Sequence, residues 1–389
     1  MKKLLLTVVA ALVLAPAAAA GGADVRFATF NASLNRNVAG QLVADLSTPN
    51  NAQAAAVAEI VQRVRPDVLL INEFDFAPAA VGLFQQNYLS VPHNGAAPIE
   101  YPYTYIAPSN TGTPSGKDLN NSGTVGGPDD AFGFGFFPGQ FGMVVYSMHP
   151  IDPLGVRTFQ LFKWKDMPGN LIPQPFYSPD EVEILRLSSK SHWDLPIRIE
   201  GKTVHFLVSH PTPPVFDGPE DRNGTRNSDE IRLWADYITP GRSGYIYDDA
   251  GSRGGLKPGE LFVIAGDQNS DPLDGDSIPG SIQQLIEHPL VNTKVTPDSA
   301  GAVEAAALQG AANLAHRSDP RFDTADFADS APGNLRADYV LPRKTLQIAD
   351  AGVFWPILAD PLSRLTGVFP FPSSDHRAVW VDVSVPAAQ

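Results

Sequence analysis

An apolar segment near the middle of the chain leads directly into residues that can do chemistry. Leu261–Ala265 is entirely apolar, and it is followed by Gly266, Asp267 and, two residues later, Asn269. A short apolar run of this kind predicts a strand that is buried on both faces. Alternation beyond Gly266 places the carboxylate and the amide on one side of the chain, where they can orient a water molecule and a phosphoryl oxygen. The other interpretation is an Asx turn that only closes the strand.

The same pattern, an apolar run that ends in polar residues, recurs along the chain. The further strand ends present Asn31, Glu73, His210, Asp338, and the neighbours Asp375 and His376. This set is rich in oxygen and free of thiols, so it suits Mg²⁺, Mn²⁺ or Ca²⁺ better than a structural zinc site. Taken singly, His210 is also explained as a hydrogen-bonded core histidine, and Asn31 as a turn residue.

An α/β pattern positions these strand ends. Residues 24–31 predict a strand, residues 50–64 an alanine-rich helix capped by Asn50 or Asn51, and residues 67–73 a second strand. This order gathers ligands at the carboxyl edge of a sheet. Further strands are predicted at 141–147, 185–187, 195–199, 204–210 and 335–341, and a terminal strand directly after Asp375 and His376 within 373–383; further helices are predicted at 227–238 and 281–287. Residues 92–140, 161–179 and 297–334 are predicted to be long loops.

Composition and the N-terminal residues indicate an exported globular protein. Of the 389 residues, 43% are hydrophobic and 18% are charged, and no linker divides residues 21–389, so we expect one catalytic domain. Residues 1–20 begin with Lys2 and Lys3 and continue with an apolar run that ends in small residues, as in a signal peptide. That run is too short to span a membrane, and the chain has no cysteine. We predict a secreted or periplasmic protein with no transmembrane segment.

The charge of the chain bears on its substrate. The formal net charge is −14, and it becomes −16 when the two lysines of the predicted signal peptide are removed. Such a field repels polyanions unless a basic groove or a divalent cation offsets it, which disfavours long nucleic acid. The same acidity also serves simply to keep an exported protein soluble.

Taken in order and context, the strand-end motifs resemble the endonuclease/exonuclease/phosphatase superfamily of metal-dependent phosphoesterases, which includes pancreatic-type deoxyribonuclease. The matching segments are Phe30–Asn31, Pro66–Glu73, Gly142–Ser147, Ser209–His210, Gly266–Asn269, Asp338–Tyr339 and Ser374–His376. Each motif alone is weak, but the ordered set is specific. The resemblance implies an α/β fold, a four-layer α/β sandwich of two packed mixed β-sheets flanked by helices, with long surface loops.

The resemblance also implies a metal site. Glu73 would be the principal metal carboxylate, with Asn31 and Asp375 beside it. The implied cofactor is Mg²⁺ or Mn²⁺, with Ca²⁺ as a further option. A divalent ion at such a site absorbs the negative charge that in-line attack on phosphorus places on the phosphoryl oxygens.

The same resemblance assigns roles in catalysis. Asp267 would orient or deprotonate the attacking water, and Asn269 would contact the phosphate. His376 would contact the scissile phosphate, with Asp338 fixing its tautomer and charge. His210 would stabilise the transition state or protonate the leaving oxygen. The resemblance therefore implies a hydrolase acting on phosphoester bonds.

The loops match no known specificity signature, so the substrate rests on charge and motif completeness. We expect a phosphomonoesterase or phosphodiesterase acting on small or lipid-like phosphoesters, with no obligate protein partner. A secreted nuclease is the alternative, although no basic groove is evident. A non-catalytic binding module on the same fold is the alternative of another class, and the complete set of site residues argues against it. Arg222 and Arg226 could clamp a phosphate, or they could pair with the acidic neighbours Asp217, Glu220 and Asp221.

Residues 118–129 have the spacing of a calcium loop. Asp118, Asn120 and Ser122 fall at positions 1, 3 and 5, Gly123 at position 6 and Asp129 at position 12. Position 12 is usually Glu, and no helices are predicted on either side. The other interpretation is therefore an Asn- and Gly-rich surface loop.

A last group combines lysines with tryptophans. Lys163, Lys165 and Lys190, with Trp164 and Trp193 nearby in sequence, could contact an anion or a ring. Solvated loop lysines are the preferred interpretation, because long charged side chains usually keep their heads in water.

Overall fold

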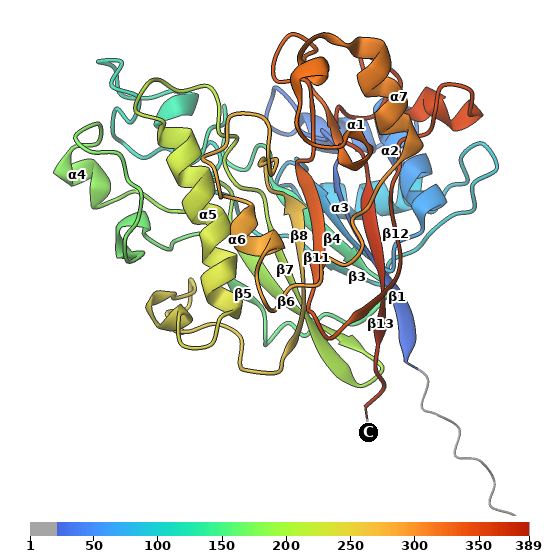
Figure 1. Cartoon of the computed structure of the whole chain (residues 1–389), viewed down its shortest axis with the longest axis horizontal. Coiled ribbons are helices and arrows are strands. Elements are labelled where there is room, and N and C mark those ends of the chain that lie inside the picture. The colour runs from blue at the N-terminus through green and yellow to red at the C-terminus, as the bar shows by residue number, and fades with distance from the viewer. Residues whose placement is uncertain (1–21, 389) are drawn as a thin grey trace, which may run out of the picture.

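Two β-sheets pack face to face at the centre of the molecule (Figure 1). The computed structural model describes residues 22–388, so the predicted signal peptide at 1–20 lies outside the described residues. The first sheet contains, in order, β12 (Gln347–Val353), β13 (Val379–Val385), β1 (Ala23–Asn31), β2 (Val68–Asn72), β4 (Met143–Ser147) and β3 (Tyr103–Tyr105). The second contains β11 (Asp338–Pro342), β8 (Leu261–Asp267), β7 (Lys202–Ser209), β6 (His192–Ile199) and β5 (Arg157–Thr158). A separate short ladder joins β9 (Ala325–Asp326) to β10 (Asn334–Leu335).

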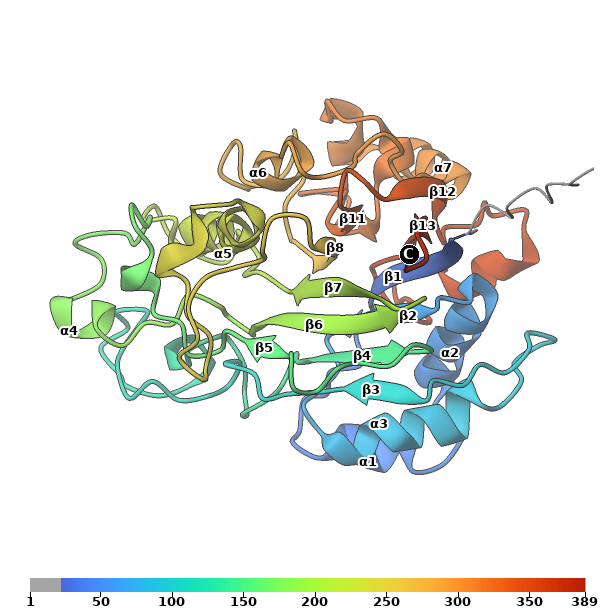
Figure 2. The ribbon, with the colours of Figure 1, turned by 90° about the horizontal axis from the view of Figure 1, so that it is seen from below.

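Helices cover the outer faces of both sheets. They are α1 (Gln41–Leu46), α2 (Ala52–Val64) and α3 (Pro78–Phe84) on the first sheet, and α5 (Arg222–Ile238) and α6 (Gln283–Ile286) on the second. The other helices are α4 (Pro179–Val182) and α7 (Ala300–Gln309). Figure 2 shows α5 and α6 on one side of the strands and α1 and α3 on the other. Two sheets between two helical layers make the predicted four-layer α/β sandwich, so the predicted fold is confirmed.

Alternation along β1 divides its side chains between two cores. Val25 and Phe27 point into the space between the sheets, where the Phe27 ring lies 5.5 Å from the ring of Phe206 on β7. Ala28 and Phe30 point the other way, toward the helices. Because successive side chains of a strand face opposite sides of its sheet, one strand contributes to both layers of the core.

The helix α2 forms where its sequence predicts it. The Asn51 side chain caps it by accepting a hydrogen bond from the Ala54 amide at 2.9 Å. Val57, Ile60, Val61 and Val64 are buried against the outer face of the first sheet. The helix ends at Arg65, which adopts a left-handed backbone before Pro66.

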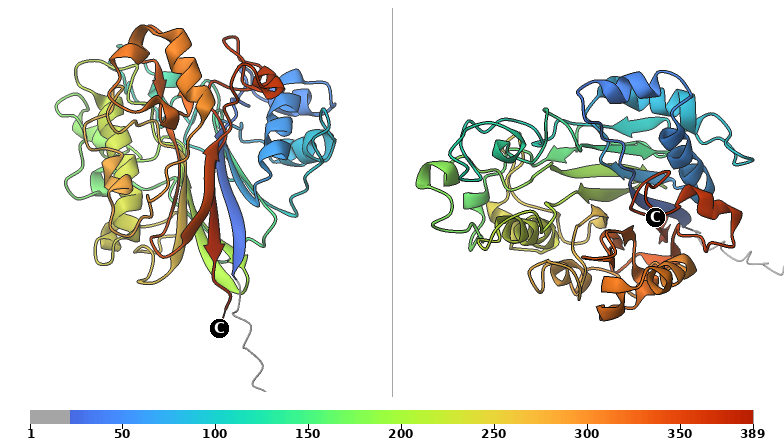
Figure 3. Two further views of the ribbon diagram at one scale, coloured as in Figure 1. Left: turned by 45° about the vertical axis from the view of Figure 1, so that its right-hand side comes forward. Right: turned by 90° about the horizontal axis from the view of Figure 1, so that it is seen from above.

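The helix α5 plays the same part for the second sheet. Ile231, Trp234 and Ile238 pack against Leu207 of β7 and Ile264 of β8. Each of these large side chains contributes about 2 kcal/mol when it leaves water. The left panel of Figure 3 shows this yellow helix and the blue helices α1 to α3 on opposite sides of the central strands.

The structure differs from three of the predicted elements, the first being the loop predicted at 92–140, which contains β3. The strand predicted at 185–187 is wrong, because Arg186 forms only an isolated bridge with Lys163 and the segment is a buried connection. The loop predicted at 297–334 contains α7, which is capped by the Ser299 side chain on the Ala302 amide at 3.2 Å. That helix is made mainly of small residues, so it lacks the stripe of large apolar side chains that identifies α2 and α5.

The two sheets are joined by hydrogen bonds at one edge. β1 runs parallel to β2, and β7 runs parallel to β8, so four carboxyl ends lie at this edge. The Asn72 side chain accepts from the Asp267 amide at 3.2 Å and donates to the Ser209 carbonyl at 3.4 Å. Because Asn72 ends β2 and the other two residues end strands of the second sheet, this side chain fixes the two sheets relative to each other where the site residues emerge.

Among residues 22–388, no helix has the length and apolarity needed to cross a membrane.

Candidate active site

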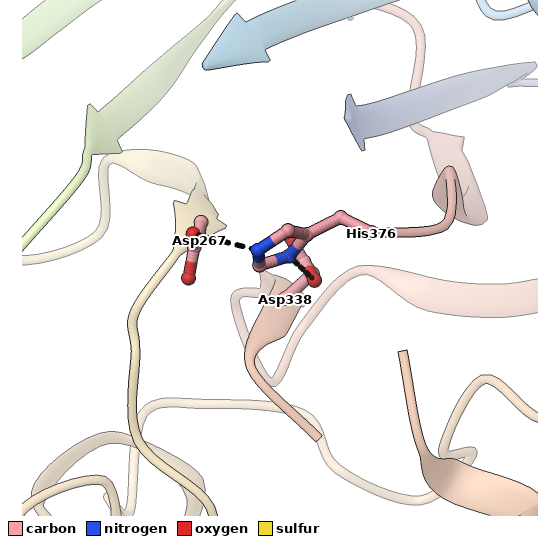
Figure 4. Close-up of side chains that lie close together, drawn as sticks. All are labelled: Asp267, Asp338 and His376. Atoms are coloured by element: carbon pink, nitrogen blue, oxygen red, sulfur yellow. Dashed lines mark hydrogen bonds and ion pairs between the residues drawn. The ribbon is translucent and has the colours of Figure 1, made fainter. Parts of the chain in front are cut away.

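A buried carboxylate–histidine–carboxylate chain lies at this edge (Figure 4). His376 Nδ1 lies 2.8 Å from Asp338 Oδ2, and its Nε2 lies 3.6 Å from Asp267 Oδ2. The three residues come from the segment before β13, from β11 and from β8, and the pairing of β11 with β8 places Asp338 directly opposite Asp267. The Thr324 hydroxyl donates to Asp338 at 2.8 Å and so fixes the carboxylate that orients the ring.

The charges of this chain favour a protonated histidine. Burial alone would lower the pKa of His376, but Asp338 and Asp267 together raise it well above its ordinary value. Burial also raises the pKa of Asp338 to about 6, against the lowering effect of His376. Above that pH the pair therefore consists of a carboxylate and an imidazolium, with a cationic Nε2–H turned toward Asp267.

Several hydrogen-bond donors converge on Asp267. Its Oδ2 accepts from the Asn31 amide at 3.0 Å and lies 3.3 Å from His210 Nε2, while its Oδ1 accepts from the Asn269 backbone at 2.9 Å. Burial works to raise the pKa of Asp267, but His376, His210 and Asn31 hold it below its ordinary value. The carboxylate is therefore ionised and held in one orientation.

The turn after β8 combines the two interpretations of its sequence. The Asn269 amide bonded to Asp267 is an Asx-type turn, and Asn269 still lines the cavity. Gly266 has a φ of 147°, and a Cβ there would lie 2.0 Å from the Ser209 carbonyl oxygen. Only glycine allows β7 and β8 to approach so closely while delivering Asp267 to the site.

His210 faces the same carboxylate from β7. Its ring is buried, its Nε2 is directed to Asp267, and its Nδ1 has no hydrogen-bond partner among the described residues. Burial and the nearby charge of Lys190 lower the pKa of His210. This histidine is therefore neutral at physiological pH, in contrast to His376.

Glu73 and Asp375 form a second, less satisfied face of the site. Glu73 Oε2 accepts from the Asn35 amide at 2.7 Å, and Asp375 Oδ1 lies 3.4 Å from the hydroxyls of Ser33 and Ser374. Both carboxylates line the cavity. Glu73 has a φ of 59°, a left-handed conformation that costs a bulky residue on the order of 1 kcal/mol. A strained, half-buried carboxylate with one donor fits a cation ligand better than a structural role.

Asn31 links the two faces. Its side-chain nitrogen donates to Asp267, and its oxygen accepts from the Ser33 amide at 3.2 Å, with a lone pair remaining. Within residues 22–388, the one group of three acidic or histidine side chains with ligand atoms mutually within 4.8 Å is Asp267, Asp338 and His376. Hydrogen bonds explain the closeness of His376 to Asp338, so the oxygen face of Glu73, Asp375 and Asn31 is the better fit for a hard divalent ion.

Neighbouring residues that the sequence did not single out support Glu73. Asp75 accepts from the amides of Arg36 at 2.9 Å and Phe141 at 3.1 Å, and burial raises its pKa to about 7. Asn35 and Asn72 contact the site directly or through Asp267. They could have been recognised from the sequence, because they lie close to Asn31 and Glu73 at the ends of the same strands.

The lysines differ from one another. Lys165 pairs with Glu183 at 2.8 Å, and Lys163 donates to the Ile184 carbonyl at 3.1 Å, as side chains near the surface. Lys190 is only 6% exposed and lines the cavity, so its prediction as a solvated lysine is wrong. Trp164 and Trp193 are core residues.

The arginine pair lines the cavity, but protein groups occupy both guanidinium groups. Arg222 is bonded to Glu220, as in the pairing alternative. Arg226 donates to the carbonyls of Leu187 at 2.8 Å and Arg186 at 2.9 Å. These bonds tie α5 to the connection at 185–187.

The loop predicted to bind calcium is held by its own hydrogen bonds. Asp118 accepts from the amides of Ser122 at 2.9 Å and Gly123 at 2.7 Å, and Asn120 accepts from Ser122 at 3.1 Å. Asp130, rather than Asp129, accepts from within the loop, whereas Asp129 lines the active-site cavity. Calcium binding there stays a prediction.

Several of the site residues line one cavity of about 860 Å³, namely Glu73, His210, Asp267, Asn269, Asp375 and His376. Much of its lining is apolar or aromatic. The lining includes Leu119, Phe134, Phe141, Tyr177, Val215, Phe216, Phe327 and Leu335. A cavity that combines a few polar groups with a largely apolar lining is the usual form of a small-molecule site.

A family model described as the Endonuclease/Exonuclease/phosphatase family matches residues 28–376. The chain therefore belongs to this family, and it is a hydrolase acting on phosphoester bonds. The matched range contains Asp267, Asp338 and His376.

Solved structures with a similar fold are distant in sequence. An endonuclease/exonuclease/phosphatase from Beutenbergia cavernae is 16% identical, with a TM-score of 0.48, over 93% of this chain and 72% of that chain. Beta toxin from Staphylococcus aureus is 14% identical, with a TM-score of 0.46, over 92% of this chain and 99% of that chain. The human Nocturnin catalytic domain is 14% identical, with a TM-score of 0.45, over 93% of this chain and 94% of that chain. No curated protein matches the chain significantly in sequence.

Proposed function

We propose that the chain is an exported, divalent-metal-dependent phosphoesterase that hydrolyses small or lipid-like phosphoesters by in-line attack of water. The observation that carries this proposal is the convergence of Asn31, His210 and His376 on the Asp267 carboxylate, which lines the cavity. A carboxylate can orient a water molecule, and the two histidines beside it can stabilise or protonate the oxygens of a phosphoryl group.

In this proposal each residue has a distinct role. Asp267 holds an attacking water by accepting its hydrogen bond, which suits a carboxylate whose pKa is below its ordinary value. His376 carries the positive charge and stabilises negative charge on the phosphoryl oxygens, while Asp338 maintains that charge. The neutral His210 donates a hydrogen bond, and Asn269 contributes an uncharged contact to the phosphate.

The metal requirement follows from the oxygen face. Glu73 would be the main ligand, with Asp375 and the Asn31 oxygen beside it, in agreement with their sparse hydrogen bonding. Mg²⁺ or Mn²⁺, and also Ca²⁺, prefer such oxygen donors. When bound there, the ion would neutralise phosphate charge and polarise water.

The lining of the cavity favours a small substrate with an apolar part. It includes six carboxylates, and its three lysine or arginine side chains include two that protein groups already occupy. A polyanion would gain little there, whereas one phosphate attached to an apolar group could place that group against Phe134, Phe141 or Phe216.

A metal-dependent hydrolysis panel tests the proposal. It would cover nitrophenyl phosphates, nucleotides, phospholipids, phytate and plasmid DNA, each with Mg²⁺, Mn²⁺ or Ca²⁺ and with a chelator. We expect activity on a small or lipid-like ester that the chelator abolishes. Full activity after thorough removal of metal would contradict the metal requirement, and no activity on any ester would favour a binding module.

A secreted nuclease is the second candidate, since the family includes nucleases by its description. With a net charge near −16 for the chain without residues 1–20, activity on DNA should be slow and should lack a steep dependence on salt. Tight DNA binding that weakens sharply between low and moderate salt would reverse the ranking.

A further inference from the structure

The backbone around Lys190 is fixed by hydrogen bonds to two other segments. The Ser189 amide donates to Glu230 at 2.6 Å, and the Lys190 carbonyl accepts from the Asn110 amide at 2.8 Å. Glu230, which is completely buried in α5, also accepts from the Thr212 amide at 2.6 Å. One carboxylate therefore fixes both the segment that carries Lys190 and the segment that follows His210.

The backbone at Gly133 packs closely against this segment. A Cβ on Gly133 would lie 1.9 Å from the Ser189 carbonyl oxygen, so a larger residue at 133 would displace the segment. Hydrogen bonds and close packing therefore fix the backbone that carries Lys190, although it lies between secondary-structure elements.

The side chain of Lys190 is constrained differently. It is 6% exposed and lines the cavity together with Glu73, His210 and Asp267. Within residues 22–388, its ammonium group has no carboxylate oxygen within 4.0 Å and no hydrogen-bond acceptor. A lysine is almost never buried unless it is paired, because an ammonium group without partners loses its hydration and gains no hydrogen bond or ion pair in return.

The two arginine side chains that line the cavity could bind a substrate anion only by breaking the hydrogen bonds that they already make. Arg222 is paired with Glu220, and Arg226 donates to backbone carbonyls. Of the lysine and arginine side chains that line the cavity in the described part of the chain, Lys190 is the one without a protein partner.

We propose that Lys190 is the substrate-binding cation of this cavity and that its ammonium group donates to the phosphoryl oxygens of the substrate. The inference rests on the proposed phosphoesterase function and adds a residue to it. Because an ammonium group interacts more strongly with a dianion than with a monoanion, Lys190 favours phosphomonoesters over phosphodiesters.

The competing explanation is that Lys190 only balances the buried charge of Glu230, Glu73 and Asp267. Burial lowers the pKa of Lys190, and the charges of Glu230, Glu73 and Asp267 act in the opposite direction. None of them lies at ion-pair distance, however, whereas Glu230 is already satisfied by two backbone amides. Charge balance predicts an effect of removing Lys190 on stability, and phosphate binding predicts an effect on affinity.

The test compares Lys190→Met with the parent protein in its metal-loaded form. Inorganic phosphate is the probe, measured as a competitive inhibitor and by calorimetry. We expect Lys190→Met to weaken phosphate binding by roughly 10- to 100-fold, as is usual for a lost charge-assisted hydrogen bond. The KM for 4-nitrophenyl phosphate should rise more than the KM for bis(4-nitrophenyl) phosphate. Lys190→Arg should restore part of the affinity.

Lys163→Met is the matched control. Lys163 is another lysine of the same region, but it donates to the Ile184 carbonyl and does not line the cavity, so its removal should leave phosphate affinity and both KM values unchanged. Lys190→Gln, which keeps a polar tip, replaces Lys190→Met if the latter loses cooperative unfolding.

Unchanged phosphate affinity and KM in Lys190→Met, with or without a lower melting temperature, would overturn the inference and leave the phosphoesterase proposal standing. Phosphate binding that depends on Lys190, in a protein that hydrolyses no ester, would support the inference about Lys190 and contradict the phosphoesterase proposal. Weak phosphate binding by the parent protein that Lys190→Met does not alter would also count against Lys190.

Discussion

The two sheets bring different kinds of groups to the same cavity. The second sheet supplies Asp267 and Asp338, which hold His376 between them, with Asp338 2.8 Å from one ring nitrogen and Asp267 3.6 Å from the other. The first sheet supplies Glu73, which has a single side-chain donor and a strained backbone. The comparison indicates that the side formed by Asp267, Asp338 and His376 is organised before any ligand binds. The side formed by Glu73 has oxygen atoms that remain available to a cation.

The largest expected effect tests the organised side. Replacing His376 by Ala removes the cation that Asp338 maintains next to Asp267, so turnover should fall by at least roughly 10²-fold with the fold intact. Asp267→Ala should cost at least as much. His149→Ala, at a histidine outside the cavity, is the control. A folded His376→Ala protein with near-normal kcat would remove the histidine from the mechanism.

The next effect tests the unsatisfied side. Glu73→Gln keeps the size of the side chain but removes its charge, so half-maximal activity should need about 10- to 100-fold more divalent metal. The melting temperature of the metal-free protein should change little, because Glu73 accepts only one side-chain hydrogen bond. Glu183→Gln, on the surface, serves as the control. The same metal dependence in both variants would show that Glu73 is not a ligand.

A smaller effect concerns an unpartnered acid near the organised side. Asp323 is buried, its Oδ1 has no hydrogen-bond partner among the described residues, and burial together with Asp271, Asp274 and Asp319 raises its pKa to about 8. Because the folded state holds this proton more tightly than the unfolded state, the contribution to stability is present at low pH and is lost as pH rises from about 4 to 8.

Asp323→Asn should therefore raise the melting temperature by a few degrees at pH 8 to 9 and change it little at pH 4 to 5. Thermal unfolding of both proteins across this range measures the effect. A difference between the two proteins that does not depend on pH would show that the carboxyl group is not responsible.

The smallest expected effect concerns the calcium loop, which lies beside the cavity through Asp129. If the loop binds calcium, it should do so at roughly 10⁻⁴–10⁻³ M, the range of extracellular sites. Calorimetry should show one binding event that Asp118→Ala removes and Glu73→Ala leaves in place. Equal binding by the parent and by Asp118→Ala would show that Asp118 does not bind calcium and only accepts hydrogen bonds from the amides of Ser122 and Gly123.

Periodicity predicted the elements that carry large apolar side chains. The strands β1, β2, β7 and β8 and the helices α2 and α5 could be recognised, because alternation and helical spacing are visible in the sequence. α5 nevertheless begins at Arg222, five residues before its predicted start, and α7 was missed. Small side chains and polar first turns leave little periodic signal, so packing against neighbours decides such segments.

The sequence by itself determined the residue types of the site and their order, since each follows a recognisable strand. It could not determine that Asn72 joins the two sheets, that Arg226 is occupied by carbonyls, or that Lys190 is buried. Those outcomes depend on contacts between segments far apart in the chain, such as Ser189 with Glu230 or Asn110 with Lys190. Local propensity carries no information about such pairs. Only the tertiary structure decided that, among the lysine and arginine side chains that line the cavity within residues 22–388, Arg222 and Arg226 have protein partners and Lys190 has none.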